Sequence, residues 1–124
     1  MTAQERGRLG EDFASEYLVS KGYEIIARNY HCRWGEIDII ARGHGYIVFA
    51  EVKLRAPNAM VSGLEAVDIR KMRKIFKSAC KWLCDNPSDQ QPRFDVIALT
   101  GRKAPFDLEH IENAFGAEVC NEFF

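Results

Sequence analysis

Two short segments of the sequence combine acidic and basic side chains in a spacing that suits phosphodiester chemistry. The first segment covers residues 35–38 and ends at Asp38. The second covers residues 51–53, from Glu51 to Lys53. Side chains alternate between the two faces of a β-strand, so Glu51 and Lys53 point to one side and Val52 to the other. For the same reason Asp38 shares a face with Glu36. The sequence therefore predicts a site built from carboxylates and a lysine.

The connection between these segments predicts which of their residues face each other. Gly-His-Gly at residues 43–45 is typical of a hairpin turn. A turn centred between residues 44 and 45 places Asp38 opposite Glu51 and Glu36 opposite Lys53, whereas a looser turn would break this pairing. Opposed residues have Cβ atoms about 4.5–5.5 Å apart, where two carboxylates repel each other. A divalent cation such as Mg²⁺ or Mn²⁺ would remove this repulsion, because hard cations prefer oxygen ligands.

A lysine beside such a cation would complete the groups needed for hydrolysis. The cation lowers the pKa of a bound water, and the Lys53 ammonium could orient that water or offset charge on the phosphate. The alternative is an ordinary surface ion pair between Glu51 and Lys53, worth about 0–1 kcal/mol. However, the preceding residues 46–50 are typical of a buried central strand, and charge at the end of such a strand is costly unless it is used. This favours the catalytic interpretation.

Hydrophobic periodicity predicts the elements that position these residues. We expect a helix over residues 3–21, opened by a Thr2–Glu5 capping box and closed by Gly22. The expected buried stripes are Leu9, Phe13, Tyr17 and Leu18 on this helix, and Met72, Ile75, Phe76, Ala79 and Leu83 on a second. The remaining expected elements are strands over 23–30, 36–41, 46–54 and 94–100, a loop over 56–63, the second helix over 64–85, and a strand or short helix over 108–116. The order α-β-β-β-α-β predicts one α/β domain over residues 1–124, with a mixed sheet flanked by helices.

The composition narrows the class of protein. Hydrophobic residues make up 47% and charged residues 28% of the 124 residues, which is typical of a soluble globular domain. No long apolar run is present, so we expect no transmembrane helix, no signal peptide and a cytoplasmic protein. The four cysteines lack a Cys-x-x-Cys pair and are expected to be reduced and mostly buried. The three histidines lack the spacing of metal ligands, so we expect solvent-facing or structural roles.

Charge is distributed unevenly along the chain. Residues 51–81 carry eight basic and three acidic residues, whereas residues 82–124 carry three basic and eight acidic residues. A basic stripe beside an acidic region can steer a polyanion to one face, although charge runs are also common on solvated helix faces. Trp34 and Tyr30 could stack on bases or belong to the core or its rim. The candidates for phosphate contacts in the basic stretch are Arg55, Arg70, Lys74 and Lys77.

An ordered set of motifs along the chain resembles that of a known family. The motifs are Gly7-Arg8-Leu9-Gly10-Glu11 with Ala14, Gly22-Tyr23, Asn29-Tyr30, Gly35-Glu36-Ile37-Asp38, Val48-Phe49-Ala50-Glu51-Val52-Lys53 with Arg55, Lys71, Arg93-Phe94-Asp95-Val96, and Glu109-His110-Ile111 with Asn113-Ala114-Phe115. They resemble the YraN-like family of bacterial predicted endonucleases in the PD-(D/E)xK nuclease superfamily, which is distantly similar to archaeal Holliday-junction resolvases. The chain departs from the family pattern at Ala50 and at Val61-Ser62-Gly63.

This resemblance implies a role for each residue of the predicted site. Asp38 and Glu51 would be metal ligands together with the backbone carbonyl of Val52, and Lys53 would be the catalytic lysine. Glu11 would be the superfamily's N-terminal acid, close to the metal or ordering water around it. The resemblance also implies a restriction-endonuclease-like core with a four- or five-stranded mixed sheet. In the basic stretch, it implies that Lys71 helps to place the phosphate.

These observations leave three classes of function open. The first is a Mg²⁺- or Mn²⁺-dependent endonuclease acting on DNA in preference to RNA, with branched or distorted DNA favouring a homodimer. The second is a nucleic-acid-binding module whose site is inactive or conditionally active, so that Asp38→Ala leaves binding unchanged. The third is an interaction protein that docks a partner through its acidic region, without salt-dependent affinity for polynucleotides. The presence of Glu11, Asp38, Glu51 and Lys53 together favours the first.

Overall fold

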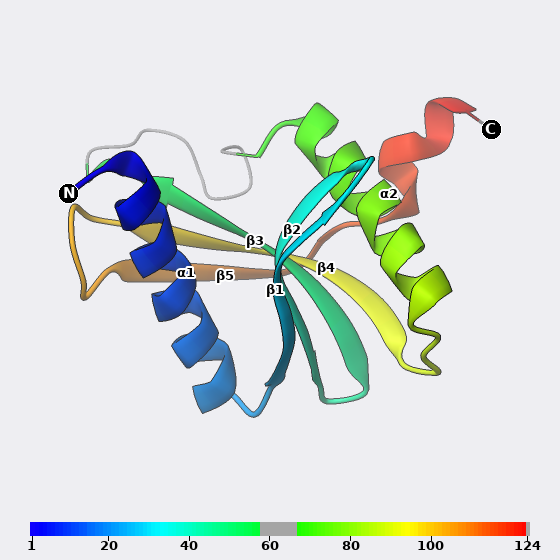
Figure 1. The fold of residues 1–124 in the computed structure, drawn as a ribbon, viewed down its shortest axis with the longest axis horizontal. Coiled ribbons are helices and arrows are strands. Elements are labelled where there is room, and N and C mark those ends of the chain that lie inside the picture. Colours follow the sequence, from blue (N-terminus) through cyan, green and yellow to red (C-terminus); the bar gives the residue numbers. More distant parts are fainter. Residues whose placement is uncertain (58–66, 124) are drawn as a thin grey trace.

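The computed structural model describes residues 1–57 and 67–123, which form a five-stranded mixed sheet with a helix on each face (Figure 1). The sheet order is β1-β2-β3-β4-β5, with β3 and β4 parallel and the other neighbours antiparallel. The elements are α1 (Ala3–Ser20), β1 (Glu24–Cys32), β2 (Gly35–Gly43), β3 (Tyr46–Arg55), α2 (Ile69–Asp85), β4 (Gln91–Thr100), β5 (Asp107–Phe115) and the 3₁₀-helix η1 (Ala117–Phe123).

This arrangement confirms the predicted α/β fold with helices flanking a mixed sheet, and it is consistent with a restriction-endonuclease-like core. The segment that fitted either a strand or a short helix is the strand β5, which pairs with β4 and is followed by η1. The predicted loop over 56–63, including Val61-Ser62-Gly63, falls mostly outside the described residues, which resume at Val67. Among the described residues, no helix is long and apolar enough to cross a bilayer.

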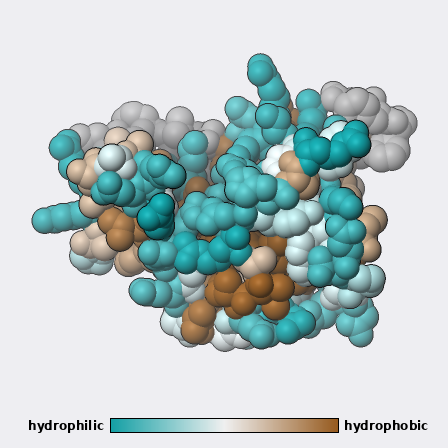
Figure 2. All heavy atoms as spheres, in the orientation of Figure 1, coloured by the Kyte–Doolittle hydropathy of each residue, from teal (hydrophilic) through white to brown (hydrophobic). Residues whose placement is uncertain are grey.

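The hydrophobic core has two parts, one on each face of the sheet. On one face, Ile75 and Ala79 of α2 pack with Phe49 of β3, and on the other face Ala14 and Leu18 of α1 are buried. In the space-filling view, hydrophilic residues cover most of the visible face, and hydrophobic residues gather below its centre (Figure 2). Each helix therefore packs on its own face of the sheet, which forms the central layer of the domain.

The helix α1 begins at the predicted cap but turns a different face to the sheet. Thr2 accepts a hydrogen bond from the Glu5 amide at 3.1 Å. The helix ends at Ser20, and Gly22, two residues further on, has a φ of +94°. Leu9 was predicted to be buried and is 41% exposed, so that prediction is wrong. The physical reason is the close approach of α1 to β3 at Gly10, where an added Cβ would lie 2.9 Å from a methyl carbon of Leu54. This contact rotates the neighbouring Leu9 towards solvent.

The helix α2 begins later than its hydrophobic pattern predicted. It starts at Ile69 and not at residue 64, because the Asp68 side chain accepts a hydrogen bond from the Lys71 amide at 2.9 Å and caps the helix. Of its predicted stripe, Ile75 and Ala79 are buried and the other members are only partly buried. Trp82 and Ser78 were missed and are also buried.

The hairpin between β2 and β3 has the predicted register. His44 and Gly45 form a two-residue turn in which both have positive φ, at 55° and 85°, as a type I′ turn requires. The paired residues run from Gly43 opposite Tyr46 to Ile39 opposite Ala50. This register brings Asp38 and Glu51 to the end of the same ladder.

The cysteines agree only partly with the sequence predictions, whereas the histidines agree with them. All four cysteines are free, as predicted, but Cys80 and Cys84 are exposed, so the expectation of mostly buried thiols is wrong for these two. They lie on the side of α2 that turns away from the sheet core. The histidines are solvent-facing or hydrogen-bonded within the scaffold; His110, for example, bonds to a buried aspartate and a tyrosine.

The tight contact at Gly43 allows a first prediction. Gly43→Ala should lower the free energy of unfolding by about 1–3 kcal/mol, because its Cβ would lie 2.8 Å from Cδ1 of Tyr23 and 3.1 Å from the Gly22 carbonyl. Gly7→Ala in α1 is the matched control, since nothing lies within 4 Å of its added Cβ, and it should stabilise the helix by about 1 kcal/mol. Urea unfolding of both variants provides the measurement. Equal shifts in the two variants would contradict the close packing at Gly43.

Candidate functional site

The candidate site lies where β2 and β3 stop pairing. Asp38 and Glu51 lie one position beyond the last pair, Ile39 and Ala50, and are only 8% and 7% exposed. The backbone amide of Val52 donates a hydrogen bond to Oδ2 of Asp38 at 2.8 Å, so the carboxylate turns towards β3. The structure therefore brings together two of the predicted metal ligands in a buried position. The third predicted ligand group, the carbonyl of Val52, belongs to the residue whose amide binds Asp38.

The electrostatic environment of these carboxylates is unfavourable for two negative charges. Burial, reinforced by the charge of Asp38, raises the pKa of Glu51 to about 8. Burial also raises the pKa of Asp38 to about 6, although the hydrogen bond from the Val52 amide opposes this change. In addition, Oε2 of Glu51 is buried without a hydrogen-bond partner among the described residues. A bound ion or water is one explanation for a buried acceptor of this kind.

Lysines lie on one side of the carboxylate pair. Nζ of Lys71 on α2 is 3.9 Å from Oε1 of Glu51 and also 3.9 Å from Oε1 of Glu36. Lys53 is exposed, and its charge lowers the pKa of Glu51, which burial and Asp38 raise. Glu51, Lys53 and Lys71 line a pocket of about 200 Å³ together with Val67 and Asp68. The structure thus places both predicted lysines beside the buried glutamate.

One predicted contact within the site is wrong. Glu36 was expected opposite Lys53, but the pairing of β2 with β3 ends at Ile39 and Ala50. Among the described residues, the start of β2 pairs only with β1. There Glu36 is opposite His31, and Oε2 of Glu36 lies 3.3 Å from Nδ1 of His31. Glu36 instead approaches the site through Lys71. The early divergence of the two strands opens the space next to Glu51.

Glu11 reaches the neighbourhood of the site from α1. Its negative charge contributes to the raised pKa of Asp38, after burial and the Val52 amide. Arg28 of β1 lies 3.8 Å from Oε1 of Glu11 and 2.8 Å from Oδ1 of Asp12. Arg28 was not singled out in the sequence, and no local pattern marks it, because the contact joins β1 to α1. It partly compensates the charge of Glu11.

The donor set fits a hydrated hard cation. Within residues 1–57 and 67–123, no three His, Cys, Asp or Glu side chains are grouped closely enough to hold a metal ion. Asp38, Glu51 and the carbonyl of Val52 would supply two carboxylates and one neutral oxygen. Mg²⁺ keeps several of its waters and commonly uses only one or two carboxylates, whereas structural zinc takes four protein ligands. The orphaned Oε2 of Glu51 is the observation that supports this fit.

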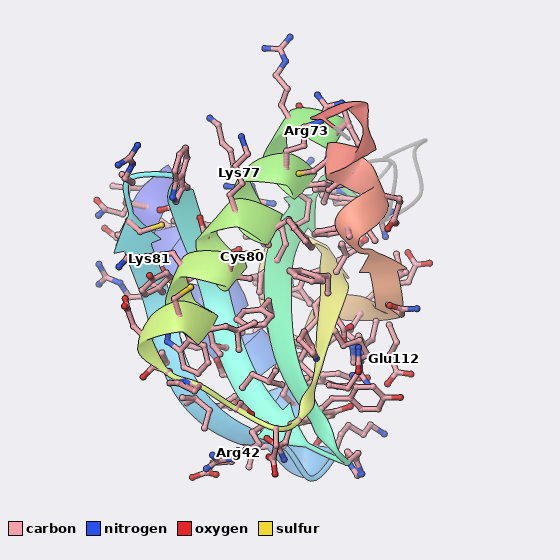
Figure 3. The ribbon with its side chains drawn as sticks, turned by 90° about the vertical axis from the view of Figure 1, so that its right-hand side faces the viewer. Arg42, Arg73, Lys77, Cys80, Lys81 and Glu112 are labelled. Atoms are coloured by element: carbon pink, nitrogen blue, oxygen red, sulfur yellow. The ribbon has the colours of Figure 1, made fainter. Side chains whose placement is uncertain are left out.

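The predicted phosphate contacts divide into two groups. Arg70 and Lys74 are exposed on α2, on the same helix as Lys71. Arg55 is different, because its side chain is only 15% exposed and lies 3.6 Å from Oε1 of Glu109. It ties the end of β3 to β5, so the structure does not bring it together with the others. Lys77 and Lys81 continue along α2 (Figure 3).

A buried polar network outside this site was not predicted. The Asp95 carboxylate is fully buried and accepts hydrogen bonds from Arg93, from His110 Nε2 at 2.7 Å and from the Asn113 amide at 3.0 Å. The Tyr17 hydroxyl bonds to the other ring nitrogen of His110 at 2.9 Å. Except for Tyr17, these residues occur in the motifs that resemble the family, which was the signal available. Their mutual satisfaction indicates a structural role.

Comparison with known proteins identifies the family of this α/β protein. A family model described as uncharacterised protein family UPF0102 matches residues 10–99. The chain is 41% identical to a UPF0102 protein of Phocaeicola vulgatus, covering 90% of this chain and 92% of that protein. It is 44% identical to one of Prosthecochloris aestuarii, covering 90% and 94% of the two chains. A relative in a Sulfurihydrogenibium species is 40% identical and is covered completely.

The protein therefore belongs to the uncharacterised protein family UPF0102. The predicted resemblance to the YraN-like family is confirmed at this level. The matched region of the family model includes Glu11 and the whole pair of segments that form the candidate site. Membership by itself assigns no activity, so the chemistry must be argued from the site.

Proposed function

We propose that this protein is an endonuclease of the PD-(D/E)xK type that hydrolyses phosphodiester bonds of DNA with Mg²⁺ or Mn²⁺. The observation that carries the proposal is the buried pair of Asp38 and Glu51, in which one oxygen of Glu51 has no hydrogen-bond partner within the part of the chain that the structure describes. A lysine on the same strand and another on α2 flank this pair. Buried carboxylates with raised pKa values and adjacent lysines are typical of a functional site in general.

Each residue of the site has a defined part in this chemistry. Asp38 and Glu51 would hold the cation with the Val52 carbonyl, and the Val52 amide fixes the orientation of Asp38. Once bound, the cation would supply a water of lowered pKa and polarise the phosphate. Lys53 is exposed at the mouth of the pocket and would orient the attacking water or balance charge on the phosphate.

The outer residues would position the substrate. Burial and Asp38 raise the pKa of Glu51, and Lys71, 3.9 Å away, opposes this rise. Lys71 would also bind a phosphate oxygen. Glu11 would order water near Asp38, and Arg28 would hold Glu11 in place. Arg70 and Lys74 would contact phosphates further along α2. Arg55 is assigned no such contact, because it is paired with Glu109.

The wider setting follows from the same proposal. DNA is the favoured partner over RNA, and branched or distorted DNA would favour a homodimer that places two sites across a junction. A cytoplasmic location would give such an enzyme access to bacterial DNA. The superfamily resemblance supports these statements, and the basic stretch of α2 supports a polyanionic substrate.

A second candidate function is a nucleic-acid-binding module with an inactive site. The observation in its favour is the small number of acidic ligands, since the described residues group no third acidic side chain with Asp38 and Glu51 closely enough to hold a metal ion. Burial and Asp38 also raise the pKa of Glu51 to about 8, which favours the neutral acid near pH 7 until a cation binds. Such a module would bind DNA through α2 without cutting it.

Cleavage of labelled branched, single-stranded and duplex DNA separates these candidates. With Mg²⁺ or Mn²⁺, we expect cutting by the wild type and a loss of at least about 100-fold in Asp38→Asn and in Lys53→Ala. Lys103→Ala and Asp107→Asn are matched controls, because Lys103 is exposed in the β4–β5 connection and Asp107 is exposed at the start of β5, and they should cut normally. Persistent cutting by Asp38→Asn would contradict the proposal. Absence of cutting by any variant, with salt-sensitive binding retained, would favour the binding module.

A further inference from the structure

A row of lysines runs along α2 away from the candidate site. Lys71, Lys74, Lys77 and Lys81 are spaced three or four residues apart, which places them on one side of a helix. At 1.5 Å per residue the row extends about 15 Å. It begins beside Glu51, 3.9 Å from Nζ of Lys71, and its far members, Lys77 and Lys81, project along α2 (Figure 3). We call these four residues the lysine row.

The surface beside the lysine row is continuous with the site. Lys71 lines both the site pocket and a second pocket of about 330 Å³, which Lys74, Glu36 and Gly35 also line. Gly35 allows this geometry, because an added Cβ would lie 3.2 Å from Cβ of Lys74. The start of β2 therefore packs directly on α2. As a result, the β1–β2 turn is held next to the lysine row.

The lysine row ends at an apolar groove. This groove has a volume of about 560 Å³ and lies between α2, the β1–β2 turn and η1. Trp34 in the turn is 41% exposed and forms one wall, and Phe76 and Cys80 form another. Two cations lie over the indole ring, with Arg33 Cζ 4.4 Å and Lys77 Nζ 5.4 Å from its centroid. We call this feature the Trp34 groove.

We propose that an unpaired stretch of DNA next to the scissile phosphate follows the lysine row and places a base in the Trp34 groove. The lysines would contact the phosphates, and the groove would receive the flat aromatic ring of a base against the indole. This inference rests on the proposed nuclease function and adds a substrate class to it. The preferred substrate is then DNA with a single-stranded segment adjoining the cleavage point.

The charge and shape of the lysine row and the Trp34 groove favour unpaired DNA over an apolar peptide or a continuous duplex. Four lysines and an arginine border the feature, which suits a polyanion better than an apolar peptide. In a continuous duplex both faces of each base are covered by its neighbours, so only an unpaired base can stack on a side chain. The ion pair between Lys81 and Asp85, at 3.1 Å, does not prevent Lys81 from contacting a phosphate. Both side chains are about half exposed, and exposed ion pairs are weak.

The test compares DNA binding without cleavage. A labelled duplex is titrated by fluorescence anisotropy in EDTA, either blunt, with a short single-stranded extension, or with the same extension made abasic. For the wild type we expect the normal extension to bind about 5- to 100-fold tighter than the abasic one. Trp34→Ala should bring this ratio close to one, and Trp34→Phe should keep most of it. Lys74→Ala should reduce the dependence of log K on log salt by about 0.7.

Lys103→Ala is the charge-matched control, because Lys103 is exposed at the β4–β5 connection, away from α2 (Figure 1). It should leave both the ratio and the salt dependence at their wild-type values. Equal binding of normal and abasic extensions, or an unchanged ratio in Trp34→Ala, would overturn this inference while leaving the nuclease proposal intact. Failure of the wild type to bind any of the DNAs in EDTA would also overturn this inference, and the nuclease proposal would then depend on the cleavage assay with Mg²⁺ or Mn²⁺. The cleavage assay separately reports on the catalytic residues.

Discussion

Without metal ions, Glu51→Gln should be more stable than the wild type at pH 8, although the two should be similar near pH 4. Burial and the charge of Asp38 raise the pKa of Glu51 in the folded protein to about 8, from an ordinary value of 4.5. Between these values the folded state holds a proton that the unfolded state has lost. The free energy of unfolding therefore falls as the pH rises through this window, by on the order of 3 kcal/mol. Glutamine cannot ionise, so the variant escapes this loss.

Urea unfolding in EDTA at several pH values measures this effect. Asp107→Asn is the control for removing one carboxylate, because Asp107 is exposed and the variant should follow the wild-type curve. Asp38 remains in both proteins, so the raised pKa of its buried carboxyl still contributes at lower pH. A wild-type stability that stays level from pH 5 to pH 8 would contradict the destabilising ionisation of Glu51.

The same variant tests the metal site independently of activity. At pH 8, Mg²⁺ or Mn²⁺ should raise the unfolding midpoint of the wild type, because a ligand that binds only the folded state stabilises it. The rise should be small or absent in Glu51→Gln, which removes a charged ligand. Wild-type protein that gains no stability from either ion, at concentrations that support cleavage by other nucleases, would contradict cation binding by this carboxylate pair.

The core of the site was predictable because it depends on local structure. The turn at His44 and Gly45 sets the register of its hairpin, and alternation along β3 then places Glu51 and Lys53 on one face. The capped start of α1 and its terminal glycine are local signals of the same kind. In each of these cases a short stretch of sequence determines the geometry, and the prediction agreed with the structure.

Predictions failed where distant elements determine the outcome. Glu36 does not face Lys53, because β2 leaves β3 and continues on β1. Leu9 is exposed because the close contact at Gly10 sets the rotation of α1. Arg28 gave no sequence signal, since its role depends on the packing of β1 against α1. The start of α2 was missed for a different reason, because it is determined by a local signal, the Asp68 cap, and not by hydrophobic periodicity.

The network around Asp95 accounts for the second large effect that we expect. Asp95→Ala should lower the free energy of unfolding by about 3–5 kcal/mol, a large part of the stability of a typical domain. The substitution removes the buried carboxylate partner of the Arg93 guanidinium, which is 8% exposed, and leaves it the more exposed carboxylate of Glu112, 3.4 Å away. It also removes the acceptor of His110 and of the Asn113 amide. Urea unfolding measures the loss, with Asp89→Ala at an exposed position as the control.

The pH dependence of this network has the opposite sign to that of Glu51. Burial alone would raise the pKa of Asp95, but hydrogen bonds from His110, Arg93 and the Asn113 amide lower it below the ordinary value. The carboxylate therefore stabilises the fold above the pKa of an unfolded aspartate, and this contribution is lost as the pH falls through the lower folded value. Asp95→Ala should consequently lose less stability on acidification than the wild type does.

A double variant separates the network from the candidate site. Arg93→Met combined with Asp95→Ala should lose less stability than the sum of the single variants, because no unpaired charge remains buried. Tyr17 anchors α1, which carries Glu11, to this network through His110. The network therefore affects the site only through the placement of α1, and cleavage should survive wherever the variant remains folded. A single Asp95 variant that lost cleavage but kept its stability would place this network in the catalytic machinery and not in the scaffold.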